Sequence, residues 1–428
     1  MKKLLLIITV SLLGLCIIAG ATSDTILIKN ARIYPVVGAP IEKGDLLISG
    51  GKIARIGTII EAPSNAVVID ASGMEVYPGF IDAYTRLGLV EIFFIPATVD
   101  TSEIGRENPE LKVTWALNPQ SIHFATSRIN GTTSALVAPS GGTFSGMTAV
   151  VRMDGWTVDE MLVKDCATMI INFPITPRPI RDIEVKKVEG EKDEVTVKLV
   201  EKIKDYLKEA RRYHELKKAA AEKGTKIPEY NAKYEALLPM LEGKMPALIS
   251  VEKAKDIKLA IKFVQDEKIF AIFRGCGQGY MVADKIAEAK IPVIIDNLYT
   301  GPTEPDEAYD AQWTNAAALA KAGVTICFSS GDNPASGKNL PYFAARAVAF
   351  GLDHEKAIEA LTINPAKIFG VDSFLGSLEP GKDADLFITT GDPLDSRSVV
   401  KYLFIKGKMI DLDNWWETMF KKWEKRPL

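Results

Sequence analysis

The chain has 428 residues, and its formal net charge at pH 7 is −3. So weak an acidity gives no reason to expect nucleic acid or an anionic membrane as a partner. Three of its four cysteines, Cys166, Cys276 and Cys327, lie beyond the N-terminal segment. An odd and widely scattered set of this kind excludes a disulfide-stapled scaffold.

The N-terminal segment has the pattern of a secretory signal peptide. A basic start at Lys2 and Lys3 precedes an apolar stretch from Leu4 to Ala19, and residues 19–21 form a small-x-small end. We predict that residues 1–21 are removed and that the protein is exported, to the periplasm or the cell exterior. The alternative is an N-terminal anchor that stays attached, although an apolar stretch of this length is short for a membrane span.

Strand patterns occur at both ends of the remaining chain. Residues 22–76 hold three short alternating segments with a Gly50-Gly51 turn, and residues 372–410 hold two more. We therefore expect one small β-domain built from both termini. The final segment, 411–428, has the apolar spacing of an amphipathic helix that docks on its own domain or on a sister subunit, so a homo-oligomer is possible.

Between residues 77 and 371, helical and strand patterns alternate. Four helix-then-strand units are recognisable, in residues 120–137, 254–273, 281–296 and 315–328. Repetition of this unit over so long a stretch favours a parallel (β/α)8 barrel of the TIM type over an open sheet. One insertion, residues 178–243, is dense in Lys and Glu, and we expect it to form a solvated helical arm over the barrel mouth.

The first barrel strand carries the most informative motif. Residues 78–82 read Pro-Gly-Phe-Ile-Asp, and Tyr84 and Arg86 follow at alternate positions. This stretch closely resembles the amidohydrolase superfamily, imidazolonepropionases among them, where His-x-His occupies those two positions. The Gly-Lys-Asp-Ala-Asp-Leu sequence at 381–386 resembles a frequent signature of the same superfamily. The resemblance implies a (β/α)8 barrel with a β-sandwich of split sequence, one or two divalent metals such as zinc, and hydrolysis of carbon–nitrogen bonds.

The expected metal ligands are missing. The superfamily pattern places histidines on strands one, five and six and an aspartate on strand eight; at these positions the chain has Tyr84 and Arg86, Ser250, Arg274, and Asp332. A guanidinium has no acceptor and cannot ligate a cation. The remaining histidines are expected to be structural; they are His123, His214 and His354. We therefore expect no metal cofactor, although the strand-four position cannot be identified from the sequence.

Two guanidinium groups at ligand positions carry the charge of one divalent metal. Together with Tyr84, Ser250 and Glu252, Arg86 and Arg274 are predicted to form a pocket for a small anionic ligand, with Asp332 as the candidate catalytic residue. In a structural alternative the two arginines pair with Asp332 and Glu252 and only stabilise the barrel. Two further alternatives are a hydrolase of C–N bonds with an unorthodox site and a scaffold or interaction protein. The glycine-rich loop at 138–146 is expected to be a tight loop at the end of barrel strand two rather than a phosphate cradle, and lining the pocket stays open to it.

Overall fold

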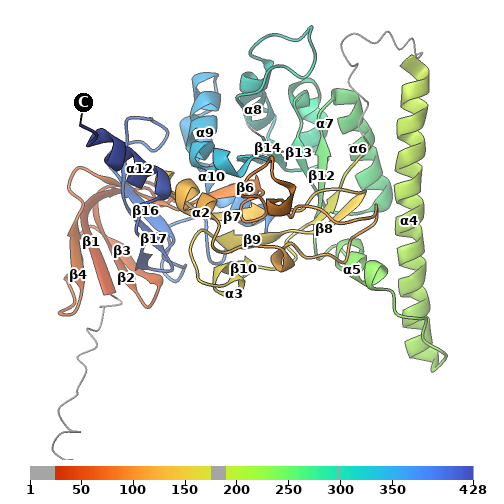
Figure 1. Ribbon diagram of the computed structural model, residues 1–428, viewed down its shortest axis with the longest axis horizontal. Coiled ribbons are helices and arrows are strands. Elements are labelled where there is room, and N and C mark those ends of the chain that lie inside the picture. The colour runs from red at the N-terminus through yellow and green to blue at the C-terminus, as the bar shows by residue number, and fades with distance from the viewer. Residues whose placement is uncertain (1–24, 175–188, 297, 428) are drawn as a thin grey trace, which may run out of the picture.

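The computed structural model describes residues 25–174, 189–296 and 298–427. The predicted signal peptide, residues 1–21, and the first part of the charged insertion lie outside these ranges. Figure 1 shows the β-domain at one end of the molecule, the barrel in the middle and the long helix α4 at the other end. Within the described ranges, no helix combines the length and apolarity needed to cross a membrane.

The β-domain combines the two ends of the chain in one eight-stranded sheet, with β4 pairing beside β1 off the main strand path. Apolar residues of both ends, such as Ile28, Leu46, Val76 and Phe404, are buried together in its core. The strands, in the order β18-β17-β16-β5-β1-β2-β3 with β4 on β1, are Lys408–Met409, Val400–Ile405, Leu386–Thr389, Glu75–Pro78, Thr25–Ile33, Ile41–Ser49, Lys52–Gly57 and Val67–Asp70. The split β-domain expected from the sequence is thus present.

The barrel follows directly, because β5 is separated from the first barrel strand by Gly79 alone. Adjacent strands pair in parallel from β6 to β7 and from β11 through β15. A bridge between Thr85 and Gly331 joins the first strand to the segment after the last one. The strands are β6 (Phe80–Thr85), β7 (Thr132–Val137), β11 (Met169–Ile171), β12 (Ala247–Val251), β13 (Ala271–Gly275), β14 (Val293–Ile295) and β15 (Ile326–Phe328).

The third barrel position is the exception to the parallel order. Strands β8 (Phe144–Met147) and β9 (Ala149–Arg152) are separated only by Thr148. β9 pairs antiparallel with β7, and β8 pairs antiparallel with β11. β10 (Leu162–Lys164) pairs antiparallel with β9 outside this circuit. One reversed stretch therefore closes the barrel between its second and fourth strands, in place of the parallel strand that the sequence predicted.

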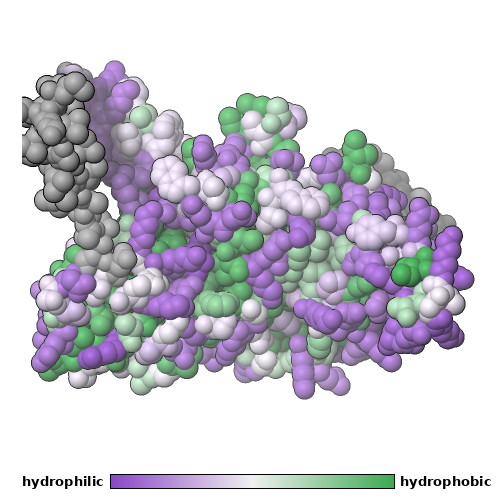
Figure 2. Space-filling view, turned by 90° about the horizontal axis from the view of Figure 1, so that it is seen from below, coloured by the Kyte–Doolittle hydropathy of each residue, from purple (hydrophilic) through white to green (hydrophobic). Residues whose placement is uncertain are grey.

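Helices cover the outside of the barrel in the alternating order that the sequence predicts. They are α2 (Ile122–Ser127), α3 (Val158–Met161), α6 (Ala254–Glu267), α7 (Ala283–Glu288), α8 (Ala311–Lys321), α9 (Leu340–Ala349), α10 (His354–Leu361) and α11 (Ile363–Ile368), with short 3-10 turns at Pro96–Thr98, Val113–Trp115, Arg128–Asn130, Gly279–Val282 and Pro334–Asn339. Their apolar faces and the outward faces of the strands form the main core. The face in Figure 2 is largely hydrophilic, with hydrophobic residues scattered between the charged ones.

The charged insertion is more firmly packed than a solvated arm. Its long helix α4 (Glu189–Lys223) buries Val200, Ile203 and Leu207 in the main core, and α5 (Ala232–Leu241) packs beside it. Arg211 of α4 forms an ion pair with Glu267 at the end of α6. Figure 1 shows α4 standing along the side of the barrel next to α6. Apolar spacing within the Lys- and Glu-rich sequence accounts for this placement.

The C-terminal segment forms the amphipathic helix that its spacing predicts. Helix α12 (Trp415–Glu424) is capped by the Asn414 side chain, which accepts bonds from the backbone of the first turn. It contacts α2, but none of its residues is buried. Trp416 and Trp423 are more than half exposed. The docking expected for this helix is therefore limited to an edge contact within the chain.

Candidate functional site at the barrel mouth

Side chains from every strand meet on the barrel axis and explain how the site is built. One buried apolar layer takes a residue from each strand in turn, namely Ile81, Leu136, Val150, Ile170, Leu248, Ile272, Ile294 and Cys327. Residues two positions further along a strand point to the same side. Ser250, Arg274, Asp296 and Ser329 occupy that next position, at the carboxyl ends of four adjacent strands. The barrel therefore directs these polar groups to its mouth, where barrel active sites lie.

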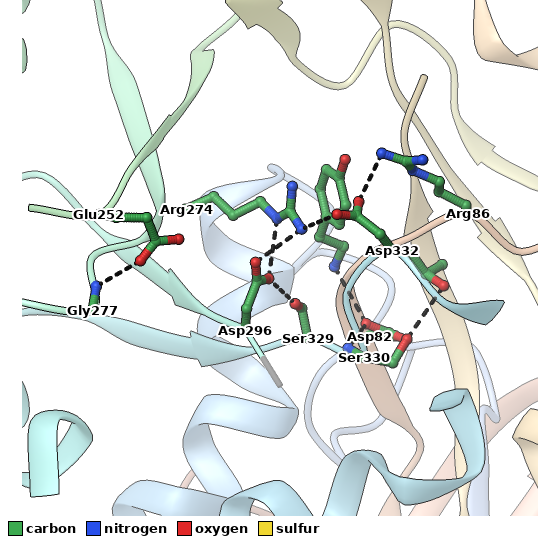
Figure 3. A network of polar contacts seen from close by, with 11 residues as sticks. Asp82, Arg86, Glu252, Arg274, Gly277, Asp296, Ser329, Ser330 and Asp332 are labelled. Atoms are coloured by element: carbon green, nitrogen blue, oxygen red, sulfur yellow. Dashed lines mark hydrogen bonds and ion pairs between the residues drawn. The ribbon is translucent and has the colours of Figure 1, made fainter. Parts of the chain in front are cut away.

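An arginine–aspartate network occupies the centre of the mouth (Figure 3). Arg274 binds Asp296 with two nitrogens, at 3.0 Å from Nε to Oδ1 and 2.8 Å from Nη2 to Oδ2. Asp332 bridges the two arginines, since its Oδ1 lies 3.0 Å from Arg86 Nη2 and its Oδ2 lies 3.2 Å from Arg274 Nη2. Ser329 Oγ donates to Asp296 Oδ1 at 2.6 Å. The structure thus brings Arg86, Arg274 and Asp332 together, as the strand positions suggested.

The ring of Tyr84 packs against Arg274 in this network. The Arg274 guanidinium carbon lies 3.6 Å from the centroid of the Tyr84 ring, which is the geometry of a cation–π contact. Burial raises the pKa of Tyr84, so its phenol stays protonated. Burial would also raise the pKa of Asp332, but Arg274 and Arg86 hold that pKa below its usual value. Asp332 is therefore an ionised carboxylate at neutral pH.

A cavity of about 440 Å³ opens beside the network. Its charged lining residues are Glu252, Arg274, Asp296 and Asp332, and Thr303, Gln312, Ser330 and Asn333 add neutral polar groups. This volume lies within the usual range for small-molecule sites, about 300–1,000 Å³. The mouth can therefore admit a small ligand next to its charged groups.

The other two predicted site residues lie at the edge of the network. Ser250 on β12 stands opposite Arg274 in the strand register, but it is not part of the cavity lining given above. Glu252 lines the cavity and accepts a hydrogen bond from Gly277 N at 3.0 Å. The structural alternative paired the two arginines with Asp332 and Glu252. In the structure the bidentate partner of Arg274 is Asp296 and not Glu252.

Three functional positions were missed by sequence reasoning. Asp296 directly follows β14, and a polar residue at the carboxyl end of a barrel strand is the signal that could have found it. Asp82, which is fully buried, accepts bonds from Ser330 N at 2.9 Å and from Ser330 Oγ at 2.5 Å and so ties β6 to the segment after β15. Asn172 follows β11, the fourth barrel strand, and its amide donates to Gly141 O and Gly142 O. The strand-four position thus holds the glycine-rich loop.

The donor set at the mouth does not fit a divalent metal. Two guanidinium groups stand where imidazoles would be needed, and they repel a cation instead of ligating it. In the part of the chain that the structure describes, no group of three or more His, Cys, Asp or Glu side chains is placed to hold a metal ion. The three histidines make contacts elsewhere, with Glu91 O, Glu242 and Asp392.

The fold and the site together define a TIM-barrel protein with a split β-domain and a barrel mouth occupied by arginines. The model of the amidohydrolase family matches residues 76–410, and the chain belongs to that family. The crystal structure of an amidohydrolase from Thermotoga maritima MSB8 is 31% identical, covers 90% of this chain and 99% of that chain, and superposes with a TM-score of 0.81.

Curated relatives are more distant or shorter in their match. Amidohydrolase tasK of Hapsidospora irregularis is 23% identical over 422 residues, which cover 89% of this chain and 42% of that protein. Imidazolonepropionase of Picrophilus torridus is 33% identical over 111 residues, which cover 24% of this chain and 28% of that protein. The chain thus spans less than half the length of these curated relatives, and the similarity to imidazolonepropionase is partial.

Proposed function

We propose that this amidohydrolase-family protein binds a small ligand bearing an anionic group at its barrel mouth, without a metal and without hydrolysing it. The observation that carries the proposal is that the Arg86–Asp332–Arg274 bridge stands where the metal ligands of the superfamily are expected. Arginine is suited to planar bidentate recognition of carboxylate and phosphate groups. The same fold that positions a metal elsewhere in the superfamily would here position two guanidinium groups.

Unused donor capacity supports binding over a purely stabilising role. Each guanidinium has five N–H donors. Arg86 Nε is buried and has no hydrogen-bond partner among the described residues. Because Asp332 is about half exposed, at 48% of its side-chain surface, an incoming anion can share or displace its contacts with the arginines.

A second candidate function is hydrolysis of a C–N bond without a metal. Family membership favours it, as does Asp332, which lines the cavity on the strand-eight side and would be the catalytic residue. However, the two arginines hold the pKa of Asp332 below its usual value, which makes this carboxylate a weak base. Binding without turnover is therefore the better supported of the two.

Calorimetric titration with small carboxylates and inorganic phosphate tests the proposal. Wild type is expected to bind at least one of them, and Arg86→Met is expected to weaken that binding at least tenfold, because it keeps side-chain volume and removes the charge. Arg55→Met is the matched control, since Arg55 is an exposed residue of β3 in the β-domain. Equal binding by wild type and Arg86→Met would refute the proposal.

Elemental analysis tests its metal-free aspect. Purified protein is expected to hold less than about one-tenth equivalent of zinc, nickel or manganese, because high-affinity sites need three or four well-placed ligands. One or two equivalents per chain would contradict the proposal and favour a metal-dependent hydrolase.

We also propose that the protein is exported, on the strength of the sequence pattern in residues 1–21. The mass of the protein recovered from an expression host with a periplasm distinguishes cleavage from anchoring. Recovery of a soluble form that begins at residue 22 is expected; a full-length form that stays with the membrane fraction would support the anchor.

A further inference from the structure

The C-terminal helix α12 carries a set of exposed aromatic side chains. Trp415, Trp416, Phe420 and Trp423 are 53%, 55%, 62% and 60% exposed. The last three follow one another at spacings of four and three residues, so they share one side of the helix. The rings of Trp415 and Trp416 meet edge to face, with their centroids 4.7 Å apart. These four residues form the aromatic face of α12, and Figure 1 shows this helix at the edge of the molecule.

A helix as short as α12 needs contacts along its apolar side. It has 10 residues, and isolated helices shorter than about 12–15 residues are marginal in water. In folded proteins most of the stability of a helix comes from packing of its apolar side. Arg128 Nη2 donates to Asp411 O at 3.1 Å just before α12, and the helix contacts α2. These contacts hold it in place but leave the aromatic face more than half exposed.

The aromatic face is large enough to form the centre of a protein interface. An aromatic side chain buries about 150–250 Å² when it is covered, so the exposed parts of these four leave roughly 300–600 Å² of apolar surface. A stable interface buries about 800 Å² on each partner. Tryptophan and phenylalanine are enriched at the centres of interfaces, and tryptophan is among the residues that contribute most to binding. The aromatic face would therefore supply about half of an interface of this size.

The charges near the aromatic face disfavour a lipid surface as its partner. Residues 411–426 contain four acidic and four basic side chains, and their formal charges cancel. Helices that lie on membranes are instead rich in Lys and Arg on their polar side, because these residues are attracted to anionic lipids. The four acidic residues would oppose such attraction. The acidic residues are Asp411, Asp413, Glu417 and Glu424, and the basic ones are Lys421, Lys422, Lys425 and Arg426.

The same charges are arranged to suit a second copy of the chain. At 3.6 residues per turn, Glu417 and Glu424 lie along one flank of the aromatic face, and Lys422 and Arg426 lie along the other. Lys422 Nζ and Arg426 Cζ are 5.9 Å and 5.8 Å from the centroid of the Trp423 ring, so the basic flank borders the aromatic face. Two copies of α12 that lie side by side in the same direction bring the acidic flank of each against the basic flank of the other.

We propose that two copies of this chain associate through α12, with their aromatic faces in contact and the two helices parallel about a two-fold axis. A two-fold interface uses the same surface on both copies, so each acidic flank finds a basic flank at the same time. The aromatic centre supplies affinity, and the charged flanks select the partner and the orientation. This inference goes beyond the proposed function, since the barrel mouth takes no part in it.

Sedimentation velocity of the purified protein over a dilution series tests the association. Wild type is expected to form dimers, and Phe420→Glu is expected to weaken the dimer at least tenfold, because it buries an unpaired charge at the centre of the interface. Since no residue of α12 is buried, this variant is expected to fold, which circular dichroism checks. Phe270→Glu is the matched control: Phe270 is 68% exposed and lies just before β13, so its loss should leave the dimer unchanged.

Two charge reversals test the orientation of the helices. Glu424→Lys and Arg426→Glu each place like charges against one another on both sides of the two-fold axis, and each is expected to weaken the dimer by about three- to tenfold. In a mixed dimer the reversed charge of one variant faces the reversed charge of the other. An equimolar mixture of the two variants is therefore expected to associate about as tightly as wild type.

Three results would overturn the proposal. One is a protein that stays monomeric at every concentration, and another is a dimer that Phe420→Glu leaves unchanged. The third is a mixture of the charge reversals that associates no more tightly than either variant alone. Flotation with phosphatidylglycerol vesicles tests the lipid alternative, and no binding is expected. Vesicle binding that Phe420→Glu abolishes, by a protein that is monomeric in solution, would assign the aromatic face to a membrane surface instead.

Discussion

The barrel mouth and the junction between barrel and β-domain both contain networks of arginine and aspartate. The two networks differ in how deeply their side chains are buried, and this difference suits them to different roles. At the junction, Arg152 of β9 binds Asp385 at 2.9 Å and Asp383 at 2.6 Å. Arg152 and Asp385 are each only 3% exposed. The second oxygen of Asp385 accepts from Lys406 N at 2.6 Å. These contacts bury Asp385 of the signature at 381–386 between the two domains, whereas Asp383 is 15% exposed and also pairs with Lys52.

At the mouth the same two residue types remain partly open to solvent. Burial raises the pKa of Asp385 in spite of Arg152, whereas the two arginines lower the pKa of Asp332 in spite of its partial burial. A sealed pair has to repay the full cost of desolvation, while a half-exposed pair keeps water as an alternative partner. The junction is therefore suited to holding domains together, and the mouth is suited to exchanging partners with a ligand.

The largest expected effect is the loss of the junction arginine. Arg152→Met should lower the free energy of unfolding by about 3–5 kcal/mol, because it leaves the buried carboxylate of Asp385 without its counter-charge, although Asp383 keeps Lys52. Chemical denaturation measures this loss. Arg397→Met is the control: Arg397 is 89% exposed in its pair with Asp395, and its loss should leave the denaturation midpoint close to that of wild type. Equal midpoints for Arg152→Met and wild type would show that the junction is not held by this network.

The corresponding substitution at the mouth should cost less. Arg274→Met is expected to lower the free energy of unfolding by about 2 kcal/mol, because Asp332 keeps Arg86 and water, and Asp296 keeps Ser329. Denaturation under the conditions used for Arg152→Met gives the comparison. A loss as large as that of Arg152→Met would mean that the mouth is as structural as the junction, and it would favour the reading in which the arginines only stabilise the barrel.

Most of the arrangement at the barrel mouth could be predicted from the local sequence, but the junction could not. Pro-Gly-Phe-Ile-Asp at 78–82 identified the first strand, and strand ends in a barrel converge, so Arg86, Arg274 and Asp332 could be placed together beforehand. Asp296 was overlooked, although it directly follows β14, because the superfamily pattern assigns no ligand to that strand. Glu252 was paired with an arginine on the basis of charge alone. In the structure its carboxylate instead accepts a hydrogen bond from Gly277 N.

The junction and the reversed strand depend on contacts that no local pattern encodes. Arg152 and Asp385 are 233 positions apart, and neither segment indicates the other. Residues 144–152 are buried throughout and mostly apolar, which is typical of a central strand in either direction. The insertion was predicted to be solvated from its average charge, whereas the spacing of Val200, Ile203 and Leu207 decided its packing.

A pH experiment extends the comparison to Asp82, a buried carboxylate whose hydrogen-bond donors are Ser330 and Tyr84. Burial raises the pKa of Asp82 to about 7, against the hydrogen bonds from Ser330 and Tyr84. The folded state thus holds this proton more tightly than the unfolded state, whose pKa is near 3.9. The contribution of Asp82 to the free energy of unfolding is therefore greatest at low pH and is lost as the pH rises from about 4 towards 7.

Relative to Asp82→Asn, wild type should lose about 1 kcal/mol of unfolding free energy between pH 5 and pH 6. Denaturation of both proteins at the two pH values gives the difference. Asp372→Asn, at an exposed position, should run parallel to wild type. A constant difference between wild type and Asp82→Asn would place the pKa of Asp82 near its ordinary value.

The smallest expected effect is a null result at the mouth. Arg86→His restores one imidazole, but a catalytic metal needs a complete set of ligands and supporting hydrogen bonds to lower the pKa of its water. Arg274 and Ser250 would still occupy two other ligand positions, and the guanidinium of Arg274 would still repel the metal. No zinc-dependent cleavage of a dipeptide or cyclic amide is therefore expected from this variant, with wild type assayed in parallel. Measurable turnover would mean that the mouth retains a nearly complete hydrolytic site, and the contrast with the junction would then be one between a catalytic and a structural network.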